Sequence, residues 1–574
     1  MDKKDVAKIL EEIALMLELK GENTFKIRAY QNGARSIETL ETSLLKLVEK
    51  NELKKVPGIG QAISEKVTEL IETGEMTYYK ELKEAFPESI FDLFKVPGLG
   101  PKKVKVLYEE LEIETLGELE YACVENRLMD LKGFGKTTQD KILRGIENLK
   151  KYQGKYLVST GLMVLKELED YFEKEDRVLR FSEAGSLRRR KEVIKDVDIL
   201  VAVKEEDREA VGNHFVDFER VEEIIAKGET KVSVRLDMGM NVDLRLVTEK
   251  EFPYALHHFT GSKDHNTKMR QIAKKKGLKM NEYGIFNGDE RVPAKTESDV
   301  FSILDLAMIP PELREDQGEI EAAEEDALPR LVGKEDLKGL FHIHSHYSDG
   351  VNSMEELVQE AMDRGLQYIG ISDHSQSAFY ANGQNPEDVK KQHKEIDKLR
   401  EKYPDIKILK GIESDILNDG SLDYEEEVLE TFDYIIASLH SNLKMERELM
   451  TKRLVGAIEN PYTKILGHMT GRLLLSREGC DFDEERVFKA LKDNNVAVEI
   501  NSNPHRLDLD WRKCKMAKNM GISITIDPDA HKLSGFQDVE YGVGIARKGW
   551  IEKEDVINGK EFAELQELWG LISE

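Results

Sequence analysis

Histidine and acidic side chains are concentrated in residues 341–350, which read FHIHSHYSDG. This stretch contains His342, His344, His346 and Asp349, although the whole chain has only 13 histidines. Imidazole nitrogens and carboxylate oxygens are the usual protein ligands of Zn²⁺, Mn²⁺ and Fe²⁺. The stretch therefore raises the prediction of a catalytic metal centre.

Further histidines and acids lie at the ends of successive predicted strands. After residue 336, short apolar runs alternate with helical patterns, which is typical of a βα barrel or a similar parallel sheet. Side chains at the C-terminal ends of barrel strands converge on one mouth. Nine residues fit this pattern: His342, His344, Asp349, His374, Glu413, His440, His468, Asp529 and His531. Such a ligand set, without thiolates, suits two or three Zn²⁺, Mn²⁺ or Fe²⁺ ions and the hydrolysis of a phosphoester. We interpret His346 as a loop residue, and Asp373 and His505 fit the pattern less well.

A second set of acids lies on two short predicted strands. Asp196 and Asp198 are two residues apart in DVDILVAV, so on a strand they point to the same face. Two carboxylates on one half-buried face repel each other unless a divalent metal neutralises them. Asp243, in MNVDLRLV, completes a site for two Mg²⁺ ions if the two strands are neighbours. Ser186 and the arginines at 188–190 would then hold a triphosphate. The alternative is that DVD is a solvent-facing strand edge.

Three segments in the helical first 150 residues share a hydrophobic–Pro/Lys–Gly–hydrophobic–Gly core followed by a helical pattern. Glycine permits a tight turn and the close approach of a phosphate to backbone N–H groups at a helix N-terminus. We therefore expect DNA contacts that do not read sequence. The residues concerned are Gly58, Gly60, Gly98, Gly100, Gly133, Gly135 and, after the second turn, Lys102, Lys103 and Lys105. The alternative is a set of ordinary helix–helix turns.

Composition limits the location and the partners of the chain. The net charge of -27 argues mildly against a nucleic-acid binder, although local patches can override that tendency. Cys123, Cys480 and Cys514 are too scattered for a disulfide framework or a thiolate zinc site, which indicates a reducing environment. No apolar run reaches the ~18 residues of a membrane span, and the N-terminus lacks a secretory pattern. We expect a soluble, cytoplasmic, monomeric protein with no membrane partner.

The front part of the chain resembles two known families. The glycine turns resemble the helix-hairpin-helix module of DNA repair proteins. The stretch GSLRRR…DVD, followed by VDLR and by residues 257–286, is similar to the family X DNA polymerases. This resemblance covers residues 1–313 and implies a small N-terminal domain followed by fingers, palm and thumb.

The polymerase resemblance implies a role for each matching position. Asp196, Asp198 and Asp243 would bind the catalytic Mg²⁺ ions, for which Mn²⁺ is an alternative. The nucleotide-binding positions are Gly185, Ser186 and Arg189 (triphosphate turn), Phe259 and Gly261 (sugar-facing turn), Asn266 (incoming base edge) and Arg270 (template). Many relatives have a tyrosine–phenylalanine pair where this chain has His258–Phe259, which bears on how strictly it excludes ribonucleotides.

Lys66 matches the family lysine that forms a Schiff base with an abasic sugar during deoxyribose-phosphate removal. A lysine desolvated beside other cations can be such a nucleophile. However, Ala62 stands where the family motif has a supporting lysine. An ordinary surface lysine is therefore the alternative, and the lyase activity stays open.

The nine ligands after residue 336 resemble those of the polymerase-and-histidinol-phosphatase (PHP) domain, and all nine family positions are filled. The stretches GHMTGRLLL and EINSNPHRLDL are close to the versions fused to bacterial and archaeal family X polymerases. The fusion covers essentially the whole chain, so we expect an active metal site in the C-terminal part.

The sequence predicts a multidomain protein. It has an all-α helix-hairpin-helix region, an α+β nucleotidyltransferase palm with a thumb, and a C-terminal α/β distorted (βα) barrel. The predicted parts are a small helical domain (1–85), fingers (86–152), palm (153–250), thumb (251–313), an acidic linker that could hold a short helix but makes no core (314–335), and a PHP domain (336–574).

The expected function is a DNA repair polymerase that fills short gaps by two-metal nucleotidyl transfer. A metal-dependent 3′–5′ exonuclease would lie in the C-terminal domain, with abasic-site endonuclease or 3′-phosphatase as further activities. The expected partners are gapped or nicked duplex DNA and deoxynucleoside triphosphates. The alternatives are a polymerase tethered to a small-molecule phosphatase and a DNA-end-binding scaffold.

Overall fold

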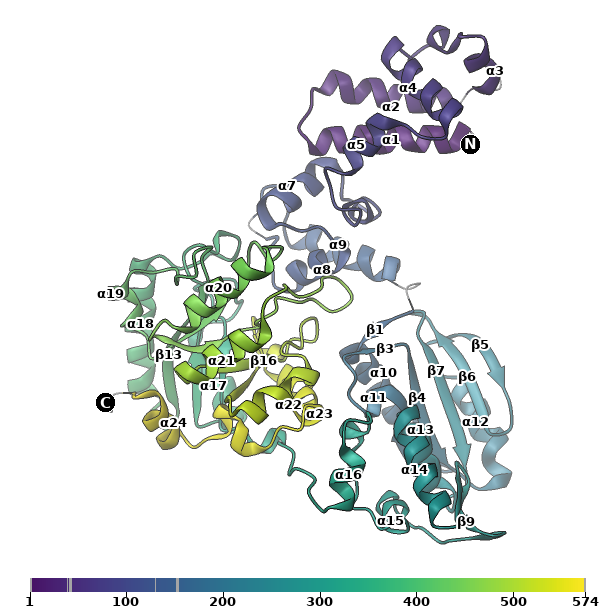
Figure 1. The fold of residues 1–574 in the computed structure, drawn as a ribbon, viewed down its shortest axis with the longest axis vertical. Coiled ribbons are helices and arrows are strands. Elements are labelled where there is room, and N and C mark those ends of the chain that lie inside the picture. The colour runs from purple at the N-terminus through teal and green to yellow at the C-terminus, as the bar shows by residue number, and fades with distance from the viewer. Residues whose placement is uncertain (1–2, 39, 41–43, 130, 151–153, 572–574) are drawn as a thin grey trace. The chain divides into compact units, whose positions relative to one another are not determined.

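The computed structural model describes residues 3–38, 40, 44–129, 131–150 and 154–571. The chain divides into two compact units, Met1–Leu149 and Lys150–Glu574, which can be followed by colour from purple to yellow in Figure 1. Within the described ranges, no helix is both long and apolar enough to cross a membrane.

The described residues of the first unit form helices and turns. Its elements are α1 (Lys3–Leu19), α2 (Thr24–Glu38), α3 (Leu44–Glu49), η1 (Leu53–Lys55), α4 (Gln61–Thr73), α5 (Thr77–Lys83), α6 (Ile90–Leu93), α7 (Pro101–Leu111), α8 (Leu116–Val124) and α9 (Lys136–Lys150). Buried apolar side chains form two cores, one within residues 6–82 and one made by Leu19 with residues 90–146. Helix α8 begins at a capping box of Thr115 and Glu118, which satisfies backbone N–H groups at its start.

The second unit begins with a five-stranded sheet of order β2-β4-β7-β6-β5. The elements of residues 156–247 are β1 (Tyr156–Leu157), α10 (Val158–Phe172), β2 (Arg180–Glu183), α11 (Gly185–Arg188), β3 (Val193–Ile194), β4 (Asp196–Ala202), η2 (Glu205–Asp207), α12 (Arg208–Val216), β5 (Val221–Lys227), β6 (Lys231–Leu236) and β7 (Asn241–Val247), and β1 pairs with β3 in a separate two-stranded sheet. Strands β4 and β7 are parallel, and the other pairs in this sheet are antiparallel. Leu200 and Ala202 of β4 pack beneath α13 (Phe252–Thr260). Because side chains alternate along a strand, Asp196 and Asp198 lie on that same face.

The next segment forms a small domain around one core. Besides α13, it contains α14 (Lys263–Lys275), β8 (Lys279–Asn281), β9 (Gly284–Asn287), β10 (Glu290–Arg291), α15 (Glu297–Ser302), η3 (Pro311–Leu313) and α16 (Glu319–Glu324). Ile320 and Ala323 of α16 are buried in the same cluster as Val300 and Phe301. This differs from the expectation that residues 314–335 make no core.

The acidic composition of that segment concealed its packing. Arg314 is fully buried and its Nη1 donates to Glu297 Oε1 at 2.5 Å. Glu319 is also fully buried, 2.8 Å from His265 Nδ1. Paired charges can be buried where unpaired ones cannot, so a charged segment can contribute to a core.

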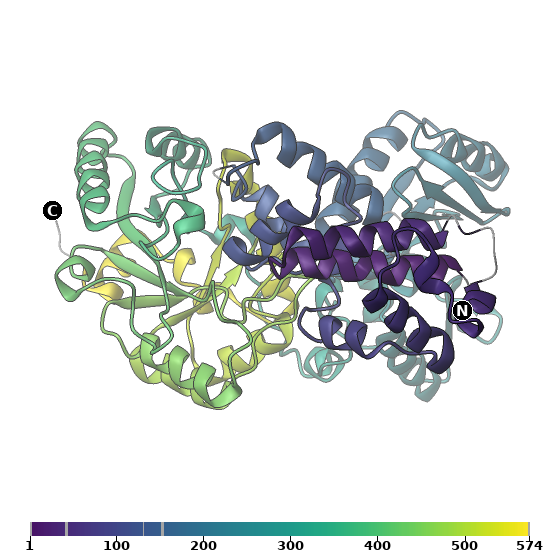
Figure 2. The same cartoon turned by 90° about the horizontal axis from the view of Figure 1, so that it is seen from above.

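The C-terminal domain contains a sheet of seven parallel strands in sequence order, β11 to β17. Its elements are η4 (Lys334–Asp336), β11 (Gly339–Ile343), α17 (Met354–Asp363), β12 (Tyr368–Ile371), η5 (Phe379–Ala381), α18 (Pro386–Lys402), β13 (Lys407–Asp415), α19 (Glu426–Leu429), β14 (Tyr434–Ser438), α20 (Arg447–Ile458), β15 (Thr463–Leu466), α21 (Glu484–Asn494), β16 (Ala497–Asn501), α22 (Trp511–Met520), β17 (Ile524–Asp527), η6 (Leu533–Asp538), α23 (Val539–Lys548), η7 (Lys553–Asp555), η8 (Ile557–Gly559) and α24 (Phe562–Trp569). A bridge between Ile343 and Ala530 brings the first strand beside the segment after the last. The sheet therefore nearly closes into a barrel, with helices around its outside (Figure 2).

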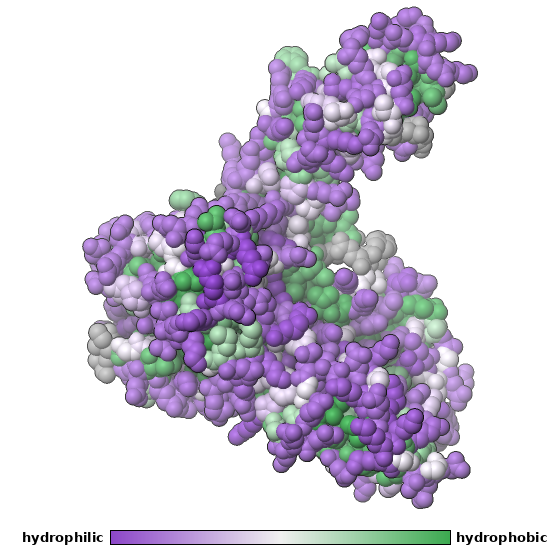
Figure 3. Space-filling view, viewed as in Figure 1, coloured by the Kyte–Doolittle hydropathy of each residue, from purple (hydrophilic) through white to green (hydrophobic). Residues whose placement is uncertain are grey.

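Burial follows this architecture. The strands of the C-terminal sheet are almost wholly buried, as expected for parallel strands covered by helices. The visible surface is mainly hydrophilic, with apolar side chains scattered over it (Figure 3).

Candidate metal centres and nucleic-acid contacts

The strand ends of the C-terminal barrel place all nine predicted ligands in one region. His342 is in β11, and Glu413 is in β13. The others follow β11, β12, β14, β15 or β17 along the chain. The loops after β11 and β17 are tied together because His344 N–H donates to the carbonyl of Ala530 at 2.9 Å.

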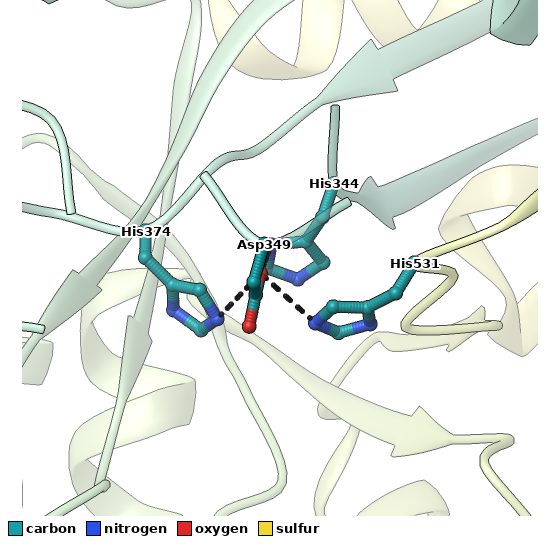
Figure 4. Close-up of side chains that lie close together, drawn as sticks. All are labelled: His344, Asp349, His374 and His531. Carbon is teal, nitrogen blue, oxygen red and sulfur yellow. Dashed lines mark ion pairs between the residues drawn. The ribbon is translucent and has the colours of Figure 1, made fainter. Parts of the chain in front are cut away.

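The nine side chains form four overlapping groups whose ligand atoms lie within 4.8 Å of one another. The groups are His344/Asp349/His374/His531, His342/Glu413/His468, His342/His344/Asp529 and His374/Glu413/His440. Figure 4 shows the first group, in which Asp349 lies between His374 and His531. His346 is exposed, and it belongs to none of these groups, as is also true of Asp373 and His505.

Two carboxylates that the sequence reasoning missed orient the histidines. His342 Nδ1 lies 2.5 Å from Glu499 Oε1, which turns Nε2 toward Glu413 at 3.2 Å. Asp415 Oδ1 is hydrogen-bonded to Nδ1 of His440. The Nε2 atom of His440 lies 3.1 Å from Glu413 Oε1. Metal-binding histidines usually have the other ring nitrogen held in this way. The donor set therefore fits bound divalent metal ions.

The pKa values of two histidines in the cluster are shifted in opposite directions. Burial, with His531 and His374, lowers the pKa of His344 to about 4, so this imidazole is neutral at pH 7. Burial opposes protonation of His374, but Asp349 and Glu413 outweigh it and raise its pKa to about 10. Carboxylates in the cluster thus hold protons on some histidines. A metal ion can supply the same charge.

The palm places the three predicted aspartates on one face of two adjacent strands. Asp198 on β4 is directly opposite Asp243 on β7. Burial, with Asp196 and Asp243, raises the pKa of Asp198 to about 6. Burial and Asp243 likewise raise the pKa of Asp196.

The ligand atoms of the three aspartates do not form a compact cluster in this structure. Among the described residues, the groups with ligand atoms within 4.8 Å of one another all lie in the C-terminal domain. Lys231 Nζ lies 2.6 Å from Asp243 Oδ2, and Ser233 Oγ donates to its Oδ1 at 2.6 Å. These two β6 residues, which the sequence reasoning missed, compensate one carboxylate. Lys231 and Ser233 alternate with valines in KVSV, just before the strand that carries Asp243. This pattern was the available sequence signal that both face the same side as Asp243.

Two predicted nucleotide-binding turns are joined by Arg189, and the first of them lies beside Asp198. A Cβ on Gly185 would lie 2.1 Å from Asp198 Oδ2, so only glycine permits this approach. Arg189 donates from Nη1 to the carbonyl of Thr260 at 2.5 Å, and from Nε to Glu315 Oε1 at 2.9 Å. Arg189 thereby joins the turn at Gly185 to the turn at Gly261.

The other predicted nucleotide contacts lie on the same domain in different environments. Ser186 and Phe259 are half-buried, and the guanidinium of Arg245 lies 4.5 Å from the centre of the Phe259 ring. Asn266 is buried and its Nδ2 donates to the carbonyl of His258 at 2.7 Å. Arg270 is exposed on α14.

The three glycine hairpins share one backbone geometry. The first glycine of each has φ of +89°, +89° and +90°, at Gly58, Gly98 and Gly133 respectively. The second glycine of each directly precedes α4, α7 or α9. A Cβ built on any of these second glycines meets no atom within 4 Å, so the space in front of the helix is open. Lys102 is exposed, and Lys103 Nζ lies 5.3 Å from the centre of the Phe134 ring in the third hairpin.

Lys66 lies on α4 in the first unit. Its Nζ is 4.8 Å from the centre of the Tyr78 ring, and Lys26 Nζ is 5.6 Å from the same ring. Lys66 is half-buried, so it is not fully desolvated.

Family models match four parts of the chain. They are described as Helix-hairpin-helix domain (residues 1–76), SAM-like Helix-hairpin-helix tandem (90–148), DNA polymerase beta thumb (255–315) and PHP domain (341–503). These matches and the folds described above confirm the predicted multidomain architecture.

One curated relative extends over the whole chain. It is the DNA polymerase/3′-5′ exonuclease PolX of Bacillus subtilis (strain 168), 38% identical over 571 residues, covering 99% of both chains. The chain belongs to the family X DNA polymerases that carry a C-terminal PHP domain. It is therefore an enzyme of the DNA polymerase/3′–5′ exonuclease class, as the sequence predicts.

Other similarities cover parts of this family X chain. A protein named Probable phosphatase, from Thermoanaerobacter sp. (strain X514), is 29% identical over 39% of this chain and 91% of its own length. A Leishmania infantum polymerase beta, solved as a ternary P/T complex, is 25% identical over 40% of this chain and 98% of its own. Its TM-score of 0.27 is too low to inform the fold.

Proposed function

We propose that this enzyme fills short gaps in damaged duplex DNA and processes 3′ ends at a separate centre. The observation that carries the proposal is the coexistence of two ligand sets. Asp198 faces Asp243 in the palm, and nine ligands form overlapping groups in the C-terminal barrel. DNA synthesis adds a nucleotide to a 3′ terminus with release of pyrophosphate, and 3′–5′ excision removes one by hydrolysis, so a repair enzyme can use both.

In the palm, the proposed ligands of two Mg²⁺ ions, with Mn²⁺ as an alternative, are Asp196, Asp198 and Asp243. The raised pKa of Asp198, about 6, supports this role, because a carboxylate so placed is stabilised by a nearby cation. Ser186 and Arg189 would bind the triphosphate. Divalent ions, when bound in either centre, supply Lewis acidity that activates a hydroxyl or water and neutralises phosphate charge.

In the C-terminal barrel, the nine ligands are proposed to hold two or three Zn²⁺, Mn²⁺ or Fe²⁺ ions. Glu499 and Asp415 would keep His342 and His440 oriented toward Glu413. Arg506 is buried, with Nε 3.7 Å from Asp529 Oδ2. It adds fixed positive charge beside the cluster, where the scissile phosphate would lie.

The glycine hairpins are proposed to hold the DNA backbone on either side of the gap. The open space before α4, α7 and α9 supports this, because a phosphate can approach the backbone N–H groups there. The expected partners are gapped or nicked duplex DNA and deoxynucleoside triphosphates.

One experiment tests both activities. A gapped, 5′-phosphorylated duplex with a matched or mismatched 3′ end is incubated with Mg²⁺ or Mn²⁺, with and without nucleotides. Asp198→Ala should abolish extension and keep excision, whereas His344→Ala should do the reverse. Extension by Asp198→Ala at the wild-type rate would contradict the polymerase site and favour a DNA-end-binding scaffold.

A second function for the C-terminal domain is hydrolysis of a small phosphomonoester. The similarity of this part to a protein named Probable phosphatase favours it. If His344→Ala leaves excision intact but abolishes hydrolysis of an amino-alcohol phosphate, this function replaces the nuclease.

Deoxyribose-phosphate lyase activity is proposed for Lys66. Support comes from a second cation, Lys26, because the ammonium groups of Lys26 and Lys66 both lie near the ring of Tyr78. Borohydride reduction should trap wild-type protein on incised abasic DNA. Lys66→Ala should abolish trapping, and Lys26→Ala should only weaken it. Undiminished trapping in Lys66→Ala would assign the nucleophile elsewhere.

A further inference from the structure

The segment after the proposed triphosphate turn is also where the palm contacts the C-terminal domain. A Cβ on Gly544 of α23 would lie 3.3–3.5 Å from the side-chain carbons of Arg190. Arg472 Nη2 lies 3.7 Å from Glu192 Oε1. Lys548 Nζ donates to the carbonyl of Arg189 at 3.1 Å. Three residues of one short palm segment, Arg189, Arg190 and Glu192, therefore contact the C-terminal domain.

Lys548 makes the most buried of these contacts. It is the last residue of α23 and is 1% exposed. Its Nζ donates to Glu315 Oε1 at 2.6 Å and to the carbonyl of Glu312 at 3.3 Å, in addition to that of Arg189. Burying a lysine costs free energy unless its charge is paired, so this ammonium group depends on Glu315.

Glu315 is shared between the two domains. The oxygen that accepts from Lys548 also accepts from Arg189 Nε at 2.9 Å. Its other oxygen lies 3.5 Å from Lys191 Nζ. One carboxylate is thus paired with three cations. The net positive charge of these four groups lies next to the turn formed by Gly185 and Ser186.

Sharing Glu315 determines how much positive charge Arg189 can offer. If Lys548 were absent, Glu315 would pair more completely with Arg189 and Lys191. The local surplus would fall by one charge, and an anionic triphosphate would bind more weakly. Lys548 also donates to the Arg189 carbonyl, so it fixes the backbone as well as the charge.

We propose that Lys548, a residue of the C-terminal domain, is a positioning residue for nucleotide binding in the polymerase domain. It acts by holding Glu315 and the backbone of Arg189. Binding of the incoming nucleotide then depends on the barrel being docked against the palm. This inference rests on the proposed function, in which Arg189 binds the triphosphate.

The test uses full-length Lys548→Met, Lys548→Arg, Glu315→Gln and the double variant Lys548→Met/Glu315→Gln. The KM for nucleotide and kcat are measured on a gapped duplex, and 3′–5′ excision is measured on the same DNA without nucleotides. We expect Lys548→Met to raise the nucleotide KM roughly tenfold, with kcat and excision within about twofold of wild type. Lys548→Arg, which keeps the charge, should recover part of the loss.

The double variant separates a charge effect from simple loss of packing. Removing Glu315 together with Lys548 leaves no extra carboxylate to neutralise Arg189, so the KM should return toward wild type. Lys553→Met, which changes an exposed lysine of the same domain, is the matched control and should leave both reactions unchanged.

Two results would overturn the inference. An unchanged KM in Lys548→Met is one. The other is a Lys548→Met protein in which kcat and excision fall equally and the melting temperature is lower, with no recovery when Glu315→Gln is added. That pattern would indicate that Lys548 only supports the structure. Arg189→Met tests the proposed function separately from the role of Lys548. If this variant leaves the nucleotide KM unchanged, the proposed binding of the triphosphate by this turn is itself wrong.

Discussion

Asp198 lies where an ionised carboxylate is destabilising unless a cation is near. Its pKa of about 6 in the folded protein lies above the ordinary value of 3.8. The penalty for ionisation is therefore absent below pH about 4 and complete above pH about 6. At neutral pH the folded, metal-free protein carries the full penalty.

Replacing Asp198 by Asn should therefore stabilise the metal-free protein while abolishing primer extension. In EDTA at pH 7.5 the free energy of unfolding should rise by up to about 3 kcal/mol, and the gain should shrink toward pH 4. Thermal melting of both proteins across this range measures it. A gain that stays the same at every pH would show that ionisation of Asp198 is not its cause.

Glu499 is a second residue whose role can be tested separately. Its carboxylate orients His342 without belonging to any of the four ligand groups. Glu499→Gln should lower metal affinity or excision 10–100-fold, and excess Mn²⁺ should restore part of the excision. Primer extension should be unchanged. Glu427→Gln, at an exposed acid of the same domain, is the control. If Glu499→Gln has the metal content and the excision rate of wild type, Glu499 does not support the metal centre.

At the residue scale, the sequence pointed to side chains that the structure brings together, but not to the side chains that hold them. The nine residues were predicted because histidines and acids recur within or just after successive strands. Glu499 lies within β16 and Asp415 is the last residue of β13, so their positions along the strands do not separate them from Glu413. Their roles appear only when the histidine that each one holds is placed beside it. Lys231 was missed although KVSV alternates, because its partner Asp243 is on another strand.

At the scale of elements, the hairpins allow folding and DNA binding to be separated. Gly60 and Gly100 have φ of -77° and -89°, which alanine adopts easily, and their Cβ positions are empty. Alanine at Gly60, Gly100 and Gly135 together should leave the melting temperature nearly unchanged. It should weaken binding of a gapped duplex several-fold, because the methyl groups occupy the space that a phosphate would enter. Fluorescence anisotropy measures this, and undiminished affinity would favour ordinary helix–helix turns.

Element patterns also show what the sequence could not predict. The repeated glycine frame and the alternation of strands and helices were local signals, and the folds that they indicated were correct. The segment around α16 was read as a linker because its composition is acidic. Only the burial of Glu319 against His265, and of Arg314 against Glu297, reveals that its charges are paired inside a core.

At the scale of the whole molecule, metal binding should stabilise the C-terminal domain. A ligand that binds only the folded state adds roughly 2.7 kcal/mol at 100 times its dissociation constant. Mn²⁺ added to EDTA-treated protein should therefore raise its melting temperature by several degrees, in a saturable manner. His344→Ala should lose most of this shift, and Asp198→Ala should keep it. Equal shifts in wild type and His344→Ala would place the stabilising metal outside the barrel.

The overlap of the four ligand groups has a further consequence. His342, His344, His374 and Glu413 each belong to two groups. A single change at any of them therefore alters two of the four groups at once. We therefore expect the loss of one shared residue to disturb the cluster more than the loss of a residue that belongs to one group, such as Asp349.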